Sequence, residues 1–195
     1  MLSGPSHAEE VGRRIPTAVV AACRNPEVSR TLQRAFSNDS FRVYTSEDVV
    51  GVELGGGLKN VIAVAVGVSD GLGFGDNTRA ALITRGLVEM TRLGCALGAK
   101  ATTFSGLSGM GDLIVTCTSR LSRNRNVGER LGRGETLDQI MGPMKQAVEG
   151  VWNCASARAL AHEKGIEMPI ADQVYAIVHR GKNPRDAVRT LMGRN

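Results

Sequence analysis

The spacing of hydrophobic positions changes once along the chain, near residue 45. Before that point, two short runs rich in small and β-branched residues, 17–23 and 41–45, flank an alternating apolar and polar segment at 28–36. The turn signal Asn25-Pro26 precedes this segment. Runs of β-formers bounded by turn residues predict strands, so residues 1–45 are predicted to fold as strand, helix, strand. Such a fragment cannot cover both faces of a parallel sheet by itself.

From Ser46 onward the strand signals nearly vanish and the apolar period becomes helical. Apolar residues recur at helical spacing from Val49 to Val66, interrupted by Gly55-Gly56-Gly57. Each glycine costs roughly 1 kcal/mol relative to alanine inside a helix. Close packing of another backbone or the approach of a ligand would each account for the three glycines.

Three later helices have recognisable ends. One is predicted to begin after the turn at 73–77, with Asn77 as its cap, and to end before Gly98. Another is predicted over 170–180 with Pro169 at its entry, and a third has Asn183 as its cap, Pro184 as its first residue and Met192 near its end. The chain is therefore predicted to be mainly α, with an α/β segment at 1–45 and an all-helical domain at 46–195.

Composition narrows the function classes. The 195 residues are 42% hydrophobic and 22% charged, which suits a packed core. Only seven residues are aromatic, which disfavours modules that stack single-stranded nucleic acid. Nineteen arginines against five lysines and a net charge of +5 favour an anionic partner.

Cysteine and histidine spacing indicates neither a zinc site nor a disulfide framework. The four cysteines contain no C-x-x-C pair and the three histidines are scattered, which fits a reducing cytoplasm. These residues are Cys23, Cys95, Cys117, Cys154, His7, His162 and His179. Uninterrupted apolar runs such as Val61 to Val66 are far shorter than a membrane span, and the N-terminus does not resemble a secretory signal. We therefore expect a soluble, cytoplasmic protein that binds no metal and no membrane.

Recognised phosphate loops are absent from the sequence, because neither G-x-x-x-x-G-K-[ST] nor G-x-G-x-x-G after a strand occurs. Lys59 is a candidate proton donor, since it follows three glycines and precedes the apolar run 61–68. Desolvation in such a setting favours a neutral amine and suits it to proton transfer. On spacing alone, the favoured alternative is that Lys59 extends its ammonium group to solvent.

Two further segments are candidates for chemistry. The glycine-rich loop 106–111 leads to Asp112, whose carboxylate could orient a substrate hydroxyl or a lysine, although a helix cap is the commoner role. Five arginines cluster around Ser122-Arg123-Asn124, which suits a phosphate monoester, a nucleic-acid backbone or merely a solvated basic loop. These arginines are Arg120, Arg123, Arg125, Arg130 and Arg133.

Several strings, in order along the whole chain, closely resemble bacterial NAD(P)-dependent sn-glycerol-3-phosphate dehydrogenases. They are L-S-G-P-S-H-A-E-E at Leu2, G-V-E-L-G-G-G-L-K-N at Gly51, G-D-N-T-R-A-A-L-I-T-R-G at Gly75, G-L-S-G-M-G-D-L at Gly106, C-T-S-R-L-S-R-N-R at Cys117, V-E-G-V at Val148 and E-M-P-I at Glu167.

The resemblance implies hydride transfer between NAD(P)H and dihydroxyacetone phosphate, giving sn-glycerol 3-phosphate for glycerophospholipid synthesis. It also implies a homodimer and a helical domain like the C-terminal domain of 6-phosphogluconate dehydrogenase. The preceding Rossmann domain is represented only by its last segment, so we expect the 195-residue chain to show little turnover alone. The alternative is a non-catalytic helical module with a basic patch for an anion or nucleic acid.

The resemblance also implies roles for individual residues. The catalytic residues are Lys59 as general acid/base, Asp112 holding it, and Thr116 in support. Substrate contacts are Gly4, Ser6, Lys59, Asn60, Asp112, Ser122, Arg123 and Asn124. Cofactor contacts are Ala8, Arg123, Ala147 and Glu149. Ala147 stands where relatives often have Val, and His7 where they often have Phe.

Overall fold

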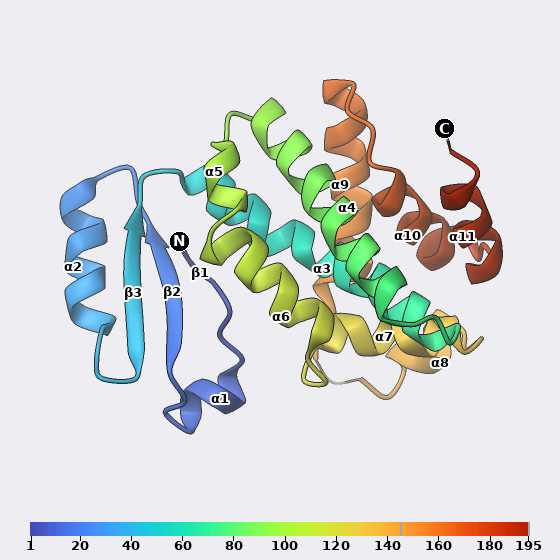
Figure 1. The fold of residues 1–195 in the computed structure, drawn as a ribbon, viewed down its shortest axis with the longest axis horizontal. Helices are drawn as coiled ribbons and strands as arrows, with labels where there is room; N and C mark the ends of the chain where they lie inside the picture. The colour runs from blue at the N-terminus through green and yellow to red at the C-terminus, as the bar shows by residue number, and fades with distance from the viewer. Residues whose placement is uncertain (145, 195) are drawn as a thin grey trace.

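A small sheet and a larger group of helices lie at opposite ends of the computed structural model, which describes residues 1–144 and 146–194 (Figure 1). The sheet has the order β1-β2-β3, with β2 parallel to β3 and β1 antiparallel to β2. Its register pairs Thr17 with Phe41 and Leu2 with Ala21. The elements of this part are β1 (Leu2–Ser3), α1 (Ala8–Gly12), β2 (Thr17–Ala22), α2 (Pro26–Phe36) and β3 (Phe41–Ser46).

The predicted strand, helix and strand are confirmed, and β2 ends one residue before the predicted limit. Asn25 caps α2 by accepting a hydrogen bond from the Glu27 N–H at 2.9 Å. Val19, Ala21 and Val43 alternate with more exposed residues and form a small core of their own. The two-residue strand β1 was not predicted, because its pairing depends on β2 rather than on a run of β-formers.

The described residues after Ser46 form helices and connections, which confirms a mainly α fold with a helical C-terminal region. The helices are α3 (Val49–Gly71), α4 (Asp76–Ala96), α5 (Ala101–Phe104), the π-helix η1 (Leu107–Gly111), α6 (Asp112–Thr118), α7 (Arg123–Gly132), α8 (Leu137–Met141), α9 (Glu149–Lys164), α10 (Pro169–Arg180) and α11 (Pro184–Met192). Helix α3 runs through the middle of this group (Figure 1). It packs against α4, α6, α7, α9 and α10.

Helix α3 is long and apolar enough to cross a membrane by length and composition, with a mean hydropathy of 1.6 over an 18-residue stretch. Thirteen of its 23 residues are buried in this structure, however. A core helix of a globular protein meets the same criterion, and α3 is such a helix here. Glycines and Lys59 interrupt its apolar residues, so no single uninterrupted apolar run in the sequence reaches this length.

The predicted helix ends agree with the structure except at the start of α4. Helix α10 begins at Pro169, and the Asn183 side chain caps α11 by accepting from the Arg185 N–H at 2.9 Å, as predicted. The predicted cap at Asn77 is wrong. Gly75 occupies the cap position and Asn77 already lies in the first turn, because the chain turns earlier, at Gly73 with φ +83°.

A buried carboxylate joins α4 to α10. Glu89 is 3% exposed and accepts hydrogen bonds from the backbone N–H groups of Ile170 at 2.8 Å and Ala171 at 3.3 Å. These donors lie at the start of α10, where amides have no partner within the helix. Burial raises the pKa of Glu89 to about 7, although the two N–H donors oppose the shift.

Backbone contact between α3 and α7 explains several glycines. A Cβ atom at Gly67 would lie 2.0 Å from the carbonyl oxygen of Arg125, and one at Gly128 would lie 2.1 Å from that of Val64. In α3, a Cβ at Gly55 would meet the carbonyl oxygen of Ser108 at 2.4 Å. Gly55 thus serves helix packing, whereas Gly56 and Gly57 line the cavity described next. Close packing therefore accounts for Gly55, while the approach of a ligand to Gly56 and Gly57 stays a prediction.

Candidate functional site

A polar cavity of about 470 Å³ lies where the N-terminal segment meets α3, α6, α7 and the start of α9. Eleven of the twelve predicted site residues line it, although they come from distant parts of the sequence. These are Gly4, Ser6, Lys59, Asn60, Asp112, Thr116, Ser122, Arg123, Asn124, Ala147 and Glu149. Ala8 does not line this cavity and is exposed at the start of α1.

An ion pair between α3 and α6 lines the cavity. Lys59 Nζ lies 2.6 Å from Asp112 Oδ2, with the two side chains 19% and 3% exposed. Lys59 therefore does not extend freely into solvent, and that favoured alternative is wrong. Asp112 is the first residue of α6 and Gly111 takes the cap position, so Asp112 does not act as a helix cap. Its carboxylate instead holds the lysine ammonium at the cavity wall.

Two hydroxyl groups support the Asp112 carboxylate. The Thr116 hydroxyl donates to the Asp112 carbonyl oxygen at 2.6 Å and lies 3.4 Å from Oδ1. The Ser3 hydroxyl, from β1, lies 3.4 Å from Oδ2. Burial raises the pKa of Asp112, while Lys59, Thr116 and Ser3 act in the opposite direction. Lys59, Thr116 and Ser3 therefore stabilise the ionised form of the Asp112 carboxylate.

A chain of side-chain hydrogen bonds joins α3, α7 and α9 beside this ion pair. Asn60 Nδ2 donates to Glu149 Oε2 at 2.8 Å and to the Gly56 carbonyl oxygen at 3.2 Å. Asn124 Nδ2 donates to Asn60 Oδ1 at 3.0 Å, and Asn124 Oδ1 accepts from the Gly150 N–H at 2.8 Å. These contacts fix the helix that carries Lys59 relative to the helix that begins at Arg123.

The start of α7 forms the opposite wall. The Ser122 side chain caps this helix by accepting from the Arg125 N–H at 3.3 Å. Arg123, the first helical residue, is exposed and lines the cavity. Within the described residues, no carboxylate lies within ion-pair distance of Arg123. A guanidinium with its donors available suits a planar anion such as phosphate.

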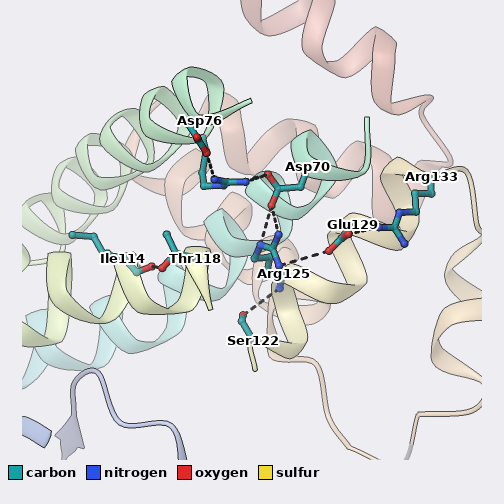
Figure 2. Close-up of polar contacts among 9 residues, drawn as sticks. Asp70, Asp76, Ile114, Thr118, Ser122, Arg125, Glu129 and Arg133 are labelled. Atoms are coloured by element: carbon teal, nitrogen blue, oxygen red, sulfur yellow. Dashed lines mark hydrogen bonds and ion pairs between the residues drawn. The ribbon is translucent and has the colours of Figure 1, made fainter. Parts of the chain in front are cut away.

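A network of ion pairs anchors α7 behind that wall (Figure 2). Arg125 lies between Asp70 at the end of α3, with Nη2 2.6 Å from Oδ2, and Glu129 at 3.6 Å. Arg79 from α4 binds the other oxygen of Asp70 at 2.9 Å. The Arg125 side chain, 16% exposed, therefore ties α7 to α3 rather than facing a ligand.

The clustered arginines are consequently not one basic surface. Besides Arg125, Arg130 pairs with Glu135 and Arg133 with Glu129. Three of the five positive charges are thus balanced by nearby carboxylates, which weakens the interpretation of this segment as a nucleic-acid backbone patch.

Sequence reasoning missed three polar residues that line the cavity: Ser3, His7 and Glu53. Ser3 and His7 flank the predicted Gly4 and Ser6, so proximity to that motif was an available signal. Glu53 lies six residues before Lys59 in α3, with no motif that singles it out. Within residues 1–144 and 146–194, no cluster of three or more His, Cys, Asp or Glu residues could hold a metal ion.

Comparison with known proteins decides the family. The sequence model of a protein family described as "NAD-dependent glycerol-3-phosphate dehydrogenase C-terminus" matches residues 48–189. The corresponding N-terminus family model matches residues 1–29. The chain belongs to the NAD-dependent glycerol-3-phosphate dehydrogenase family.

Relatives within this family match along the whole chain. Glycerol-3-phosphate dehydrogenases [NAD(P)+] of Citrifermentans bemidjiense and Geobacter sulfurreducens are each 59% identical over 100% of the chain. The crystal structure of glycerol-3-phosphate dehydrogenase from Coxiella burnetii has a TM-score of 0.96 and 47% identity over 99% of the chain. The chain spans 58% of the length of the two relatives and 59% of the Coxiella chain.

Proposed function

We propose that this chain is the substrate-binding and proton-transfer part of an NAD(P)-dependent glycerol-3-phosphate dehydrogenase. It would interconvert dihydroxyacetone phosphate and sn-glycerol 3-phosphate for glycerophospholipid synthesis. The observation that carries the proposal is the Lys59–Asp112 ion pair at 2.6 Å, in a cavity that Arg123 also lines. A proton donor and an anion-binding group thus face the same space.

Reduction of the ketone adds a hydride to the carbonyl carbon and a proton to its oxygen. A bound nicotinamide cofactor supplies the hydride. The Lys59 ammonium donates the proton to the oxygen in reduction and takes it back in oxidation. Asp112, fixed by Thr116 and Ser3, keeps the ammonium at the cavity wall.

The phosphate is the second anchor of the substrate. Arg123, at the start of α7 beside Ser122 and Asn124, binds the phosphate oxygens, and Gly4 and Ser6 contact the substrate from the opposite segment. Binding energy from a remote phosphate helps to orient the reacting carbonyl. Asn60 has both amide hydrogens engaged, so it can offer a ligand only the remaining lone pair of Oδ1.

The cofactor would contact the part of the cavity wall formed by Arg123, Ala147 and Glu149. Ala8, which follows the substrate-binding residues Gly4 and Ser6 in sequence, would be a further cofactor contact. Glu149 would suit a nucleotide, because its Oε2 accepts from Asn60 and its Oε1 is left to accept from a hydroxyl or amide group of the cofactor. We assign residues 1–45 to the end of the dinucleotide-binding domain and 46–195 to the substrate domain. The assembled enzyme would be a cytoplasmic homodimer.

Activity is best tested after fusing the chain to the N-terminal part of the Geobacter sulfurreducens relative, since the chain spans 58% of that protein. We expect NADH- or NADPH-dependent reduction of dihydroxyacetone phosphate, and a loss of about a hundredfold or more in Lys59→Ala. The matched control is Lys164→Ala, at the end of α9, which should turn over normally. Wild-type turnover in Lys59→Ala would overturn the proposed role of the lysine. The unfused chain is expected to show little turnover.

A further inference from the structure

Helix α7 runs parallel to α3, the helix that carries the proposed proton donor. Gly128 approaches the carbonyl oxygen of Val64 and Gly132 approaches that of Val68, so residue numbers rise together along the two helices. The first turn of α7 carries the residue proposed to bind phosphate. The spacing and register of these helices therefore set the separation between proton donor and phosphate-binding group.

Glycine contacts bring the two helices close together without fixing their register. Side chains that interdigitate normally fix the relative position of packed helices, and the glycines of α3 and α7 contribute none. Directional polar contacts supply the register instead. They are the Asn124–Asn60 hydrogen bond at 3.0 Å and the Arg125–Asp70 ion pair.

The Arg125–Asp70 ion pair is the stronger of these contacts (Figure 2). Arg125 Nε and Nη2 lie 2.9 and 2.6 Å from Asp70 Oδ2, and Arg79 Nη2 lies 2.9 Å from Oδ1. The Asp70 and Arg125 side chains are 7% and 16% exposed, so solvent screens their attraction little. Asp70 thus holds the Arg125 guanidinium at a defined place along α3.

Arg125 is held at its backbone as well as at its guanidinium. The Ser122 hydroxyl accepts from the Arg125 N–H at 3.3 Å. Ser122 and Arg123 line the cavity, and Arg125 lies in the same helical turn. A buried ion pair is weak evidence for stability by itself, and some proteins retain one because it selects a single arrangement. Here the arrangement is that of the first turn of α7 on α3.

We propose that Asp70 is a positioning residue for phosphate binding. Through Arg125 it sets the register of α7 on α3 and so places Arg123 for the substrate phosphate. The inference rests on the proposed function and assigns that site a further residue. Asp70 contacts no substrate in this role and transfers no proton. Its effect lies in the affinity for ligands that carry a phosphate.

The sign of the effect separates positioning from simple attraction between charges. Asp70→Asn removes a negative charge, so Coulomb attraction alone would strengthen the binding of an anion. Loss of register should instead weaken it, by about tenfold for sn-glycerol 3-phosphate in calorimetry on the 195-residue chain. The matched control is Asp76→Asn, because Asp76 belongs to the same network but is 93% exposed and pairs with Arg79. This control should not weaken binding.

A double-mutant cycle with Arg123→Gln shows whether Asp70 acts through Arg123. Once the Arg123 guanidinium is absent, Asp70→Asn should cause no further loss of affinity, so the two effects should not add. The free energy of unfolding, measured in urea, should nevertheless fall equally in both backgrounds. A merely structural role of Asp70 would change the stability alone, or would change the affinity equally in both backgrounds.

Arg125→Lys tests the same contact if Asp70→Asn does not fold, as judged by far-UV circular dichroism. Lysine keeps the positive charge but lacks the planar guanidinium, which binds Asp70 Oδ2 through two nitrogen atoms. This variant should weaken the binding of sn-glycerol 3-phosphate although no charge is lost.

The outcomes separate this inference from the proposed function. Unchanged or tighter binding in Asp70→Asn, or in Arg125→Lys if the first variant does not fold, overturns the inference. If Arg123→Gln still weakens binding, the phosphate site stands. Additive losses in the cycle also overturn the inference alone. No response of the wild-type protein to sn-glycerol 3-phosphate, or unchanged binding in Arg123→Gln, overturns both proposals.

Discussion

Replacing Gly67 by alanine tests the contact that sets the distance between α3 and α7. The new Cβ would lie 2.0 Å from the Arg125 carbonyl oxygen, whereas ordinary van der Waals contact begins near 3.4 Å. The two backbones would therefore have to separate by more than 1 Å. Strain from overpacking is typically about 1–3 kcal/mol, and alanine recovers roughly 1 kcal/mol through its higher helix propensity. A separation of this size places the strain in the upper half of that range, so we expect Gly67→Ala to lower the free energy of unfolding by about 1–2 kcal/mol.

Gly57→Ala is the matched control because it lies in the same helix. There the nearest atom to a new Cβ is Asn153 Nδ2 at an ordinary 3.7 Å. Helix propensity should then raise stability by up to about 1 kcal/mol. Urea unfolding followed by far-UV circular dichroism measures both variants, with unchanged m-values indicating that only stability differs. Equal effects of the two substitutions would refute the argument from backbone contact.

Two other contacts give measurable changes. In the unfolded chain Glu89 ionises near pH 4.5, whereas in the folded chain it keeps its proton up to about pH 7, so stability should fall as pH rises through this interval. The free energy of unfolding should fall by about 3 kcal/mol across this pH range. Urea unfolding at a series of pH values should show the fall in the wild-type protein but not in Glu89→Gln. Arg125→Met should lower the free energy of unfolding by about 3 kcal/mol, because it removes one of the partners of the Asp70 carboxylate. Arg133→Met removes a more exposed ion pair and should lower it by less than about 1 kcal/mol. Similar unfolding free energies for the two arginine variants would contradict the role given to the Asp70 network.

Local signals account for the parts of the fold that the sequence predicted well. Proline at the start of a helix and asparagine at its cap act within a few residues, so the beginnings of α10 and α11 were predictable. The error at Asn77 has the same origin. A capping residue was present, but the preceding turn at Gly73 had already directed the chain into helix.

The site was much less predictable from the residues alone. Lys59 and Asp112 lie 53 positions apart, and each had a commoner structural role that spacing favoured. Similarity to a family connected them, and the fold provides the physical reason, which is the packing of α6 against α3. The only signal for Ser3 was its position beside the predicted Gly4, since its contact with Asp112 arises from the pairing of β1 with β2.

The side-chain contacts around the cavity join residues that are remote in sequence. Ser3 and Asp112 are 109 positions apart, and Asn60 and Glu149 are 89 apart. Contacts of such high contact order form slowly, because long loops must close before they contribute. The backbone hydrogen bonds within a helix join residues only four positions apart, so helices can form earlier. A population rich in helix can therefore exist before the cavity is assembled, and the recovery of helical signal during refolding is no measure of the ability to bind a ligand.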